Sequence, residues 1–228
     1  MREQFKAQMG QLNETIIAEA RAAAKAMDRA ATALADANLT KAERVIDADK
    51  HIDLLERAID EMGVSLLARQ TPVATDLRVV VSGLRLSSTL ERMGDLARHV
   101  AYIARGRYPE KVVSGEVREI LLMMAEHARN AGQKMAQLIE TENLDLALEI
   151  EREDDVLDDL HEKTFELILD ENISLNRQEI IDIVLLGRYL ERYGDHAVSV
   201  ARRVQYTVQG LHEISDPFAK IDLTEVED

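Results

Sequence analysis

The sequence of 228 residues has no cysteine, no tryptophan, only 3 prolines and few aromatic residues (4%). Without cysteine, the chain has no disulfides, no cysteine-ligated zinc or iron–sulfur site and no thiol nucleophile. A shortage of proline and aromatic residues, beside a hydrophobic content of 46%, is typical of long helices rather than sheets. The composition therefore predicts an all-α fold.

Positive charge is also scarce, because 28 lysines and arginines face 43 aspartates and glutamates, a net charge of −15. Such a chain is a poor ligand for nucleic-acid phosphates. The first ten residues lack the apolar core of a signal peptide, and no apolar run approaches the roughly 18–20 residues that cross a bilayer. We expect a cytoplasmic protein with no transmembrane segment and no nucleic-acid partner.

Hydrophobic periodicity predicts six long helices. Thr40 and Glu43 have the spacing of a capping box at the start of the second helix. Thr71 and Pro72 have the residue types of an N-cap and a first helical turn, at the start of the third. The predicted helices cover residues 3–36, 40–70, 71–105, 114–140, 143–171 and 176–209.

The two halves of the chain repeat each other. The segment LERMGDLA at 90–97 recurs as LERYGDHA at 190–197, an offset of 100, whereas the second helix recurs in the fifth with an offset of 105. The change of offset predicts an insertion in the loop around 69–76. The repeat predicts two tandem, pseudo-symmetric three-helix bundles, at 1–108 and 109–210, followed by an acidic, mobile tail at 211–228.

The repeated residues include carboxylates on adjacent faces of consecutive helices. On the second helix Asp49, Asp53, Glu56 and Asp60 form one stripe beside the apolar seam. On the third, an apolar line at 77, 81 and 84 continues into carboxylates, so we expect these to occupy positions of apolar packing. The two sets are Asp49, Asp53, Glu91 and Asp95 in the first half, and Asp154, Asp158, Glu191 and Asp195 in the second.

Four carboxylates between two helices repel one another and are costly to desolvate. Protonation, a neighbouring arginine or lysine, or a bound cation relieves this repulsion. Sites made only of oxygen ligands suit iron, manganese, magnesium or calcium better than zinc. No Glu-x-x-His of the ferritin-like di-iron bundles occurs in the chain. We therefore expect two sites for divalent or trivalent metal ions.

A simpler interpretation is that the acids lie on solvated faces or pair with Arg98 and Arg188, each one turn away along its helix. Duplication of the whole group favours the cation. So do Gly94 and Gly194, because a glycine inside a helix costs about 1 kcal/mol relative to alanine, and its repetition indicates close helix approach or room for an ion. The histidines beside the acids, His161 and His196, are candidates for the metal shell.

These motifs resemble those of the PhoU family, the accessory proteins of bacterial phosphate-specific transport. The resemblance rests on the twin segments at 90–95 and 190–196, the aspartate pairs at 49/53 and 154/158, and the loop at 70–78. It implies two bundles with one metal cluster each, held by the eight carboxylates. It also implies a non-enzymatic negative regulator of the phosphate-starvation response. This regulator would couple the ATPase subunit of the phosphate ABC transporter to a sensor histidine kinase, as a homodimer held at the inner face of the membrane by its partners.

One departure from the twin motif is Leu96, which stands where the second copy has His196, so the first site lacks a possible imidazole ligand. Two other functions stay open: a hydrolase with a multinuclear metal site, and a metal-free helical adaptor. Hydrolysis needs an added base or nucleophile, and the sequence offers no obvious one. We therefore expect no enzymatic activity, no catalytic residues and no organic cofactor.

Overall fold

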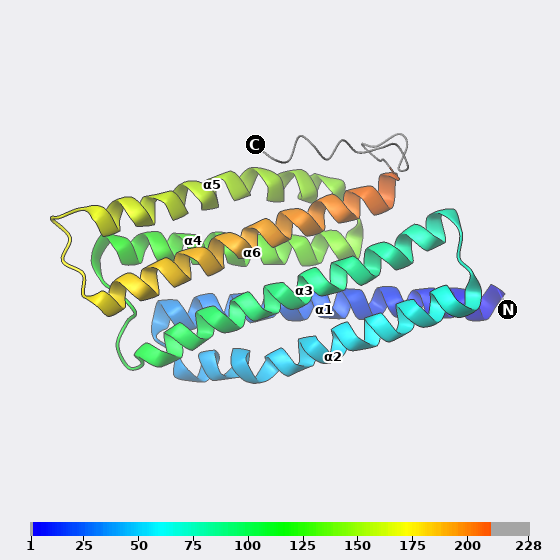
Figure 1. Ribbon diagram of the computed structural model, residues 1–228, viewed down its shortest axis with the longest axis horizontal. Helices are drawn as coiled ribbons and strands as arrows, with labels where there is room; N and C mark the ends of the chain where they lie inside the picture. The colour runs from blue at the N-terminus through cyan, green and yellow to red at the C-terminus, as the bar shows by residue number, and fades with distance from the viewer. Residues whose placement is uncertain (1, 211–228) are drawn as a thin grey trace, which may run out of the picture.

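A computed structural model describes residues 2–210 and consists of six long helices, with no strand in that range (Figure 1). The predicted all-α class and helical-bundle architecture are confirmed. The tail predicted at 211–228 lies outside the described residues. The helices are α1 (Arg2–Asp36), α2 (Leu39–Gln70), α3 (Ala74–Arg107), α4 (Gly115–Thr141), α5 (Leu144–Leu169) and α6 (Arg177–Gln209).

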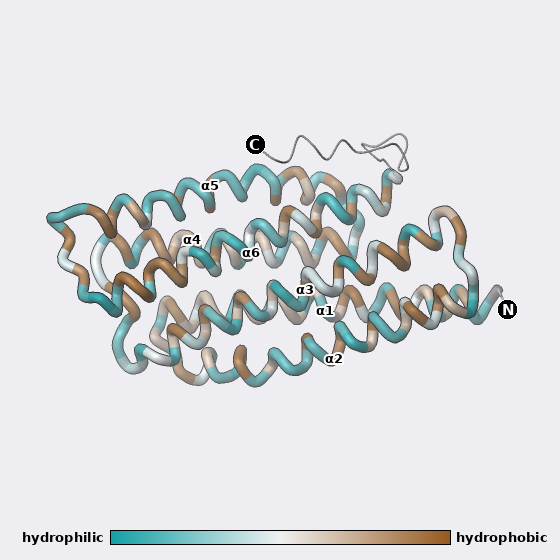
Figure 2. The backbone as a smooth tube through the Cα atoms, viewed as in Figure 1, coloured by the Kyte–Doolittle hydropathy of each residue, from teal (hydrophilic) through white to brown (hydrophobic). Residues whose placement is uncertain are grey.

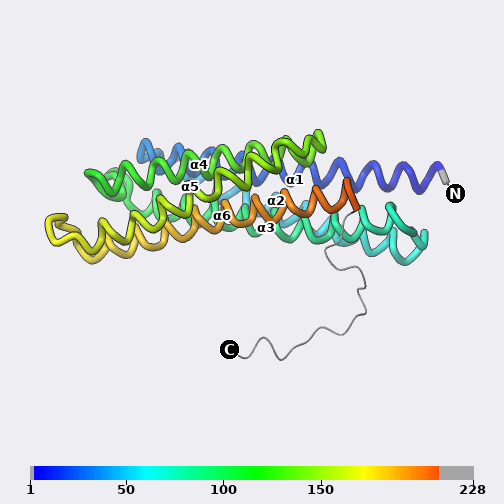
Figure 3. The backbone as a smooth tube through the Cα atoms, turned by 90° about the horizontal axis from the view of Figure 1, so that it is seen from above, coloured from blue at the N-terminus to red at the C-terminus, as the bar shows by residue number. Residues whose placement is uncertain are grey.

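The helices form two three-helix bundles, α1–α3 and α4–α6, that lie side by side along their lengths (Figure 1). The bundles meet through two helix pairs, α1 with α4 and α3 with α6, whereas α2 and α5 lie at opposite outer edges (Figures 1 and 3). The buried apolar side chains of both bundles form one contiguous core. Most of α5 is hydrophilic (Figure 2), as expected for an outer helix. Within residues 2–210, no helix combines the length and hydropathy of a membrane span.

The hydrophobic periodicity that predicts the first two helices corresponds to buried faces in the structure. Val45, Ile52, Ile59 and Leu66, which follow one another at intervals of seven on α2, are all buried. The face of α1 is built largely from alanines, whose small side chains let α2, α3 and α4 all pack against it. Its buried residues include Leu12, Ile16, Ala20, Ala23, Met27, Ala30 and Leu34.

Two predicted helix starts are wrong. The N-cap of α2 is Asn38, whose side-chain oxygen accepts a hydrogen bond from the backbone N–H of Lys41 at 3.0 Å. Thr71 ends α2 in the left-handed conformation, with φ of 46°, and α3 begins only at Ala74. The end of α6 is as expected, because Gly210 is its left-handed C-cap.

The insertion in the first half does not lie in the loop. α2 has 32 residues against 26 in its counterpart α5, and the connection at 71–73 is shorter than the one at 170–176. The additional residues therefore continue the helices at the tip of the α2–α3 hairpin.

The two mid-helix glycines mark close helix approaches, as predicted. A β-carbon at Gly94 would lie 2.7 Å from Cδ1 of Ile52 on α2. At Gly194, it would lie 2.5 Å from Oδ1 of Asp154 and 2.7 Å from Cδ2 of Leu157, both on α5. Each hairpin is therefore packed closely at the level of its carboxylates.

We expect Gly94→Ala to destabilise the protein because its methyl group overlaps Ile52. Overpacking costs about 1–3 kcal/mol, partly offset by about 1 kcal/mol of helix propensity. Ile52→Val removes the clashing Cδ1, so the double variant should be more stable than the sum of the two single effects. Urea unfolding of the four proteins measures this. Strictly additive effects would contradict the contact.

Candidate metal centres in the two helical hairpins

The α2–α3 hairpin brings the first predicted set of carboxylates together. Asp49 is buried, and Asp53, Glu91 and Asp95 are partly buried. Partial burial raises the pKa of Glu91, and the negative charges of Asp95 and Glu56 raise it further. The pKa of Asp49 is raised as well, mainly by burial. The positive charge of Arg98 opposes this rise, and the negative charges of Asp53 and Asp95 add to it. These four carboxylates, with Glu56, therefore share one electrostatic environment.

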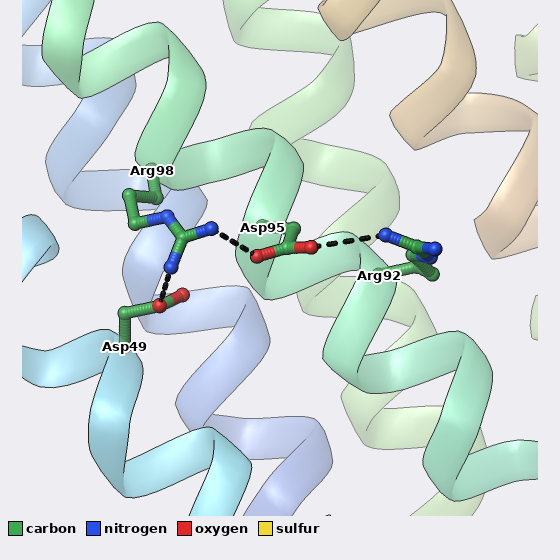
Figure 4. Close-up of polar contacts among 4 residues, drawn as sticks. All are labelled: Asp49, Arg92, Asp95 and Arg98. Atoms are coloured by element: carbon green, nitrogen blue, oxygen red, sulfur yellow. Dashed lines mark hydrogen bonds and ion pairs between the residues drawn. The ribbon is translucent and has the colours of Figure 1, made fainter.

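Arg98 bridges two of these carboxylates (Figure 4). Its guanidinium donates a hydrogen bond to Asp49 on α2 and one of 2.5 Å to Asp95 on its own helix. The second oxygen of Asp95 accepts from Arg92 at 3.2 Å. The salt-bridge interpretation is thus confirmed for Asp95. The pair of Arg98 with Asp49 on the other helix was not predicted, and Asp53 and Glu91 have no ion pair among the described residues.

A further carboxylate, Glu19 on α1, was missed by the sequence interpretation. It is 0% exposed, and its Oε2 accepts a hydrogen bond of 2.7 Å from Ser87 on α3. Its Oε1 is buried with no hydrogen-bond partner in the described part of the chain. Burial is the main reason why the pKa of Glu19 is raised to about 8. The hydrogen bond from Ser87 lowers this pKa, whereas the negative charges of Glu56 and Glu91 raise it further.

A signal for Glu19 was present in the sequence. It follows Leu12 and Ile16 and precedes Ala23 at helical spacings of four, three and four, so it stands on the buried face of α1.

The α5–α6 hairpin brings the second predicted set together. Burial raises the pKa of Asp154 to about 6, and Asp158, Asp195 and Glu191 raise it further. Oδ1 of Asp154 is buried without a hydrogen-bond partner in residues 2–210, and it lies over Gly194, which leaves room for it. Glu191 pairs with Arg188 at 2.7 Å, again as the salt-bridge interpretation expects.

The two hairpins differ in their neutralising groups. At the offset of 100 residues that relates α3 to α6, Val198 takes the place of Arg98, so Asp154 has no guanidinium equivalent to the one that pairs with Asp49. His161 takes the place of Glu56, and its Nε2 is buried without a partner among the described residues. Burial and Arg188 lower the pKa of His161, which favours the neutral imidazole that ligates metals.

His196, the other candidate for the metal shell, lies between the two bundles rather than between α5 and α6. It lines a cavity between α3 and α6 together with Arg92 and Leu96. The Leu96/His196 difference therefore belongs to that cavity, not to the hairpin sites.

The expectation that the carboxylates replace buried apolar residues is wrong. Leu77 and Val81, which lead into Glu91 along α3, are 40% and 37% exposed, and Ile181 on α6 is 51% exposed. The stripe that carries the carboxylates thus starts as an apolar surface near each hairpin tip. At mid-helix Glu91, Asp95 and Glu191 are partly buried, whereas Asp195 is exposed.

The donor set fits a hard cation, but the side chains are not arranged around one. Within residues 2–210, no three histidine, aspartate or glutamate side chains lie where they could hold a metal ion together. Buried atoms without partners, Oε1 of Glu19, Oδ1 of Asp154 and Nε2 of His161, lie among carboxylates whose pKa values are raised. The carboxylates among these groups therefore lack a neutralising partner in the described part of the chain.

Replacement of Glu19 by glutamine tests its buried environment. The pKa of Glu19 is about 8 in the folded protein and 4.5 for an ordinary glutamate. The stability that the neutral side chain contributes is therefore fully present below pH 4.5 and is lost as the pH rises towards 8. Glutamine stays neutral, so Glu19→Gln should become more stable relative to wild type between pH 5 and 8, by up to about 1.4 kcal/mol per pH unit.

Urea unfolding of metal-free protein at pH 5, 6.5 and 8 measures this difference. Glu14→Gln, an exposed glutamate on the same helix, is the control. A difference between wild type and Glu19→Gln that does not change with pH would contradict the assignment.

Comparison with known proteins identifies relatives of the whole described chain. The family model "PhoU domain" matches residues 16–104 and 121–204, one match in each bundle. The "Phosphate-specific transport system accessory protein PhoU homolog 2" of Mycobacterium tuberculosis is 37% identical over 210 residues, which cover 92% of this chain and 99% of the relative. Homolog 1 of Mycobacterium leprae is 36% identical, with 92% and 95% coverage. The crystal structure of PhoU from Pseudomonas aeruginosa superposes with a TM-score of 0.80 at 28% identity, covering 91% of this chain and all of that one.

Proposed function

The chain belongs to the PhoU family, and on that premise we propose that it is an accessory protein of phosphate transport that regulates phosphate uptake with metal ions bound in its two hairpins. The observation that carries the metal part is the repeated group of partly buried carboxylates whose pKa values are raised. The relatives are named as accessory proteins, which is consistent with a non-enzymatic role.

The proposed ligands are the eight carboxylates, with His161 added in the second hairpin. Oxygen donors favour iron, manganese, magnesium or calcium over zinc. A bound ion supplies positive charge and lets carboxylates on two helices share one partner. Gly94 and Gly194 permit the two helices of each hairpin to approach closely, so carboxylates on both helices can reach one ion. The proposed ligands are Asp49, Asp53, Glu91 and Asp95, then Asp154, Asp158, Glu191 and Asp195.

The second hairpin should bind a cation more tightly than the first. Arg98 already neutralises Asp49 and Asp95, so an ion at the first site must displace a guanidinium. In the second hairpin Arg188 pairs with Glu191 alone, and Asp154 and Asp195 have no ion pair among the described residues, because Val198 replaces the guanidinium. The expected difference in cation affinity between the hairpins thus comes from the replacement of Arg98 by Val198, and not from the replacement of Leu96 by His196.

In regulation, the proposed role is negative: the protein damps the phosphate-starvation response when phosphate is ample. It would do so as a homodimer that contacts the ATPase subunit of the phosphate ABC transporter and a membrane sensor histidine kinase. The described helices contain no membrane span, so its place at the inner face of the membrane would depend on these partners.

Deletion of the gene in its own host tests the regulatory role. In ample phosphate, and in a strain without a second copy, we expect phosphate-responsive genes to be expressed as in starvation. Wild type supplied in trans should restore repression. Glu91→Gln with Glu191→Gln should not, since these changes remove one ligand from each hairpin.

Glu43→Gln with Glu119→Gln, two exposed glutamates outside the hairpin sites, is the matched control and should restore repression. Immunoblots establish equal protein levels. Unchanged expression in the deletion strain would overturn the regulatory role, whereas full repression by the ligand variant would overturn only the need for metal.

A further inference from the structure

A cavity of about 270 Å³ lies between α3 and α6, where the two bundles meet. Three arginines line it, Arg92 from the first bundle and Arg188 and Arg192 from the second. A water molecule in the liquid occupies roughly 30 Å³, so the cavity has room for a small ion with some of its hydration water.

The lining of this cavity is positive, although the chain as a whole has a net charge of −15. Asp95 is its one acidic residue, and this carboxylate is already shared between Arg92 and Arg98. Arg188 pairs with Glu191, but Arg192 has no ion pair with any residue in 2–210. The cavity thus holds more positive charge than its own residues neutralise.

His196 of α6 also lines the cavity, between the arginines of the two bundles. A neutral imidazole carries one N–H that can donate a hydrogen bond.

The two repeats place equivalent residues on opposite sides of the cavity. Arg92 and Arg192 follow the same Leu-Glu pair in the twin segments, and Leu96 faces the cavity as its counterpart His196 does. His99 of α3 stacks on Tyr189 of α6, with ring centroids 4.9 Å apart, and these rings form another part of the lining. Packing across the interface thus fixes the two rings beside the arginines of the cavity.

We propose that this cavity binds a phosphate group, as a small tetrahedral dianion held between α3 and α6. Guanidinium groups present several N–H donors in a planar fork that matches phosphate oxygens, and they cannot lose their charge. Groups from both bundles line the cavity, so a bound anion would join the bundles. This site rests on the proposed function and extends it, since it gives the protein its own contact with phosphate beside the hairpin carboxylates Asp95 and Glu191, which pair with Arg92 and Arg188 of the cavity.

Calorimetric titration of the full chain with inorganic phosphate tests the proposal, in metal-free buffer with chloride keeping the ionic strength constant. Arg192→Gln should weaken binding by about tenfold or more, because it removes a charged donor that no carboxylate competes for. Arg177→Gln, an exposed arginine at the first residue of α6, is the matched control and should bind as wild type does.

A second arm uses phenyl phosphate. Tighter binding of inorganic phosphate identifies the free ion as the ligand, and tighter binding of phenyl phosphate identifies a phosphate group on a larger molecule. In either case, the imidazole NMR signals of His99 and His196 should shift on binding. Thermal melts verify that Arg192→Gln is folded. Absence of binding by both ligands, or equal binding by wild type and a folded Arg192→Gln, would overturn the proposal.

Discussion

The structure depends on carboxylates that are partly withdrawn from water between two closely packed helices in each bundle. Neighbouring negative charge and burial both raise their pKa values, as for Glu91 in the first hairpin and Asp154 in the second. Gly94 and Gly194 allow the helices to approach closely at this level, so the charges stay close together. Arg98 relieves part of the repulsion in the first hairpin, whereas the second has valine at that position. Carboxylates without a neutralising partner among the described residues therefore remain in both hairpins, and the proposal of bound cations is based on them.

Two regions of the molecule differ in charge. The repeated carboxylates lie in the hairpins, and a cavity lined by three arginines lies between α3 and α6, where the bundles pack together. Arg92 connects the two regions, because it donates to Asp95 of the first hairpin and also lines the cavity. Arg188 makes a second connection, because it pairs with Glu191 of the second hairpin and also lines the cavity. The proposed cation sites and the proposed anion site therefore share these two side chains.

The sequence predicts the bundle because each helix has a regular apolar face, as the seam from Val45 to Leu66 shows, and the carboxylate pairs follow from the repeat. Local signals were less decisive: Thr40 fits a capping box, but Asn38 is two residues closer to the preceding turn and caps α2 instead. Glu19 could have been found from its place on a buried face. The reach of Arg98 to Asp49 and the meeting of Arg92 with Arg192, 100 residues apart, depend on helix packing that periodicity does not encode.

The most direct test of the carboxylate constraint is the melting temperature of wild type and Asp154→Asn at pH 7.5, in chelator and with increasing Mn²⁺. Asp154 has a raised pKa and a buried oxygen without a partner among residues 2–210, so its charge should destabilise the metal-free fold. We predict that Asp154→Asn melts higher than wild type in chelator, and that Mn²⁺ raises the melting temperature of wild type more, by linkage of binding to folding. A higher melting temperature for wild type in chelator, together with equal Mn²⁺ shifts in both proteins, would contradict the account.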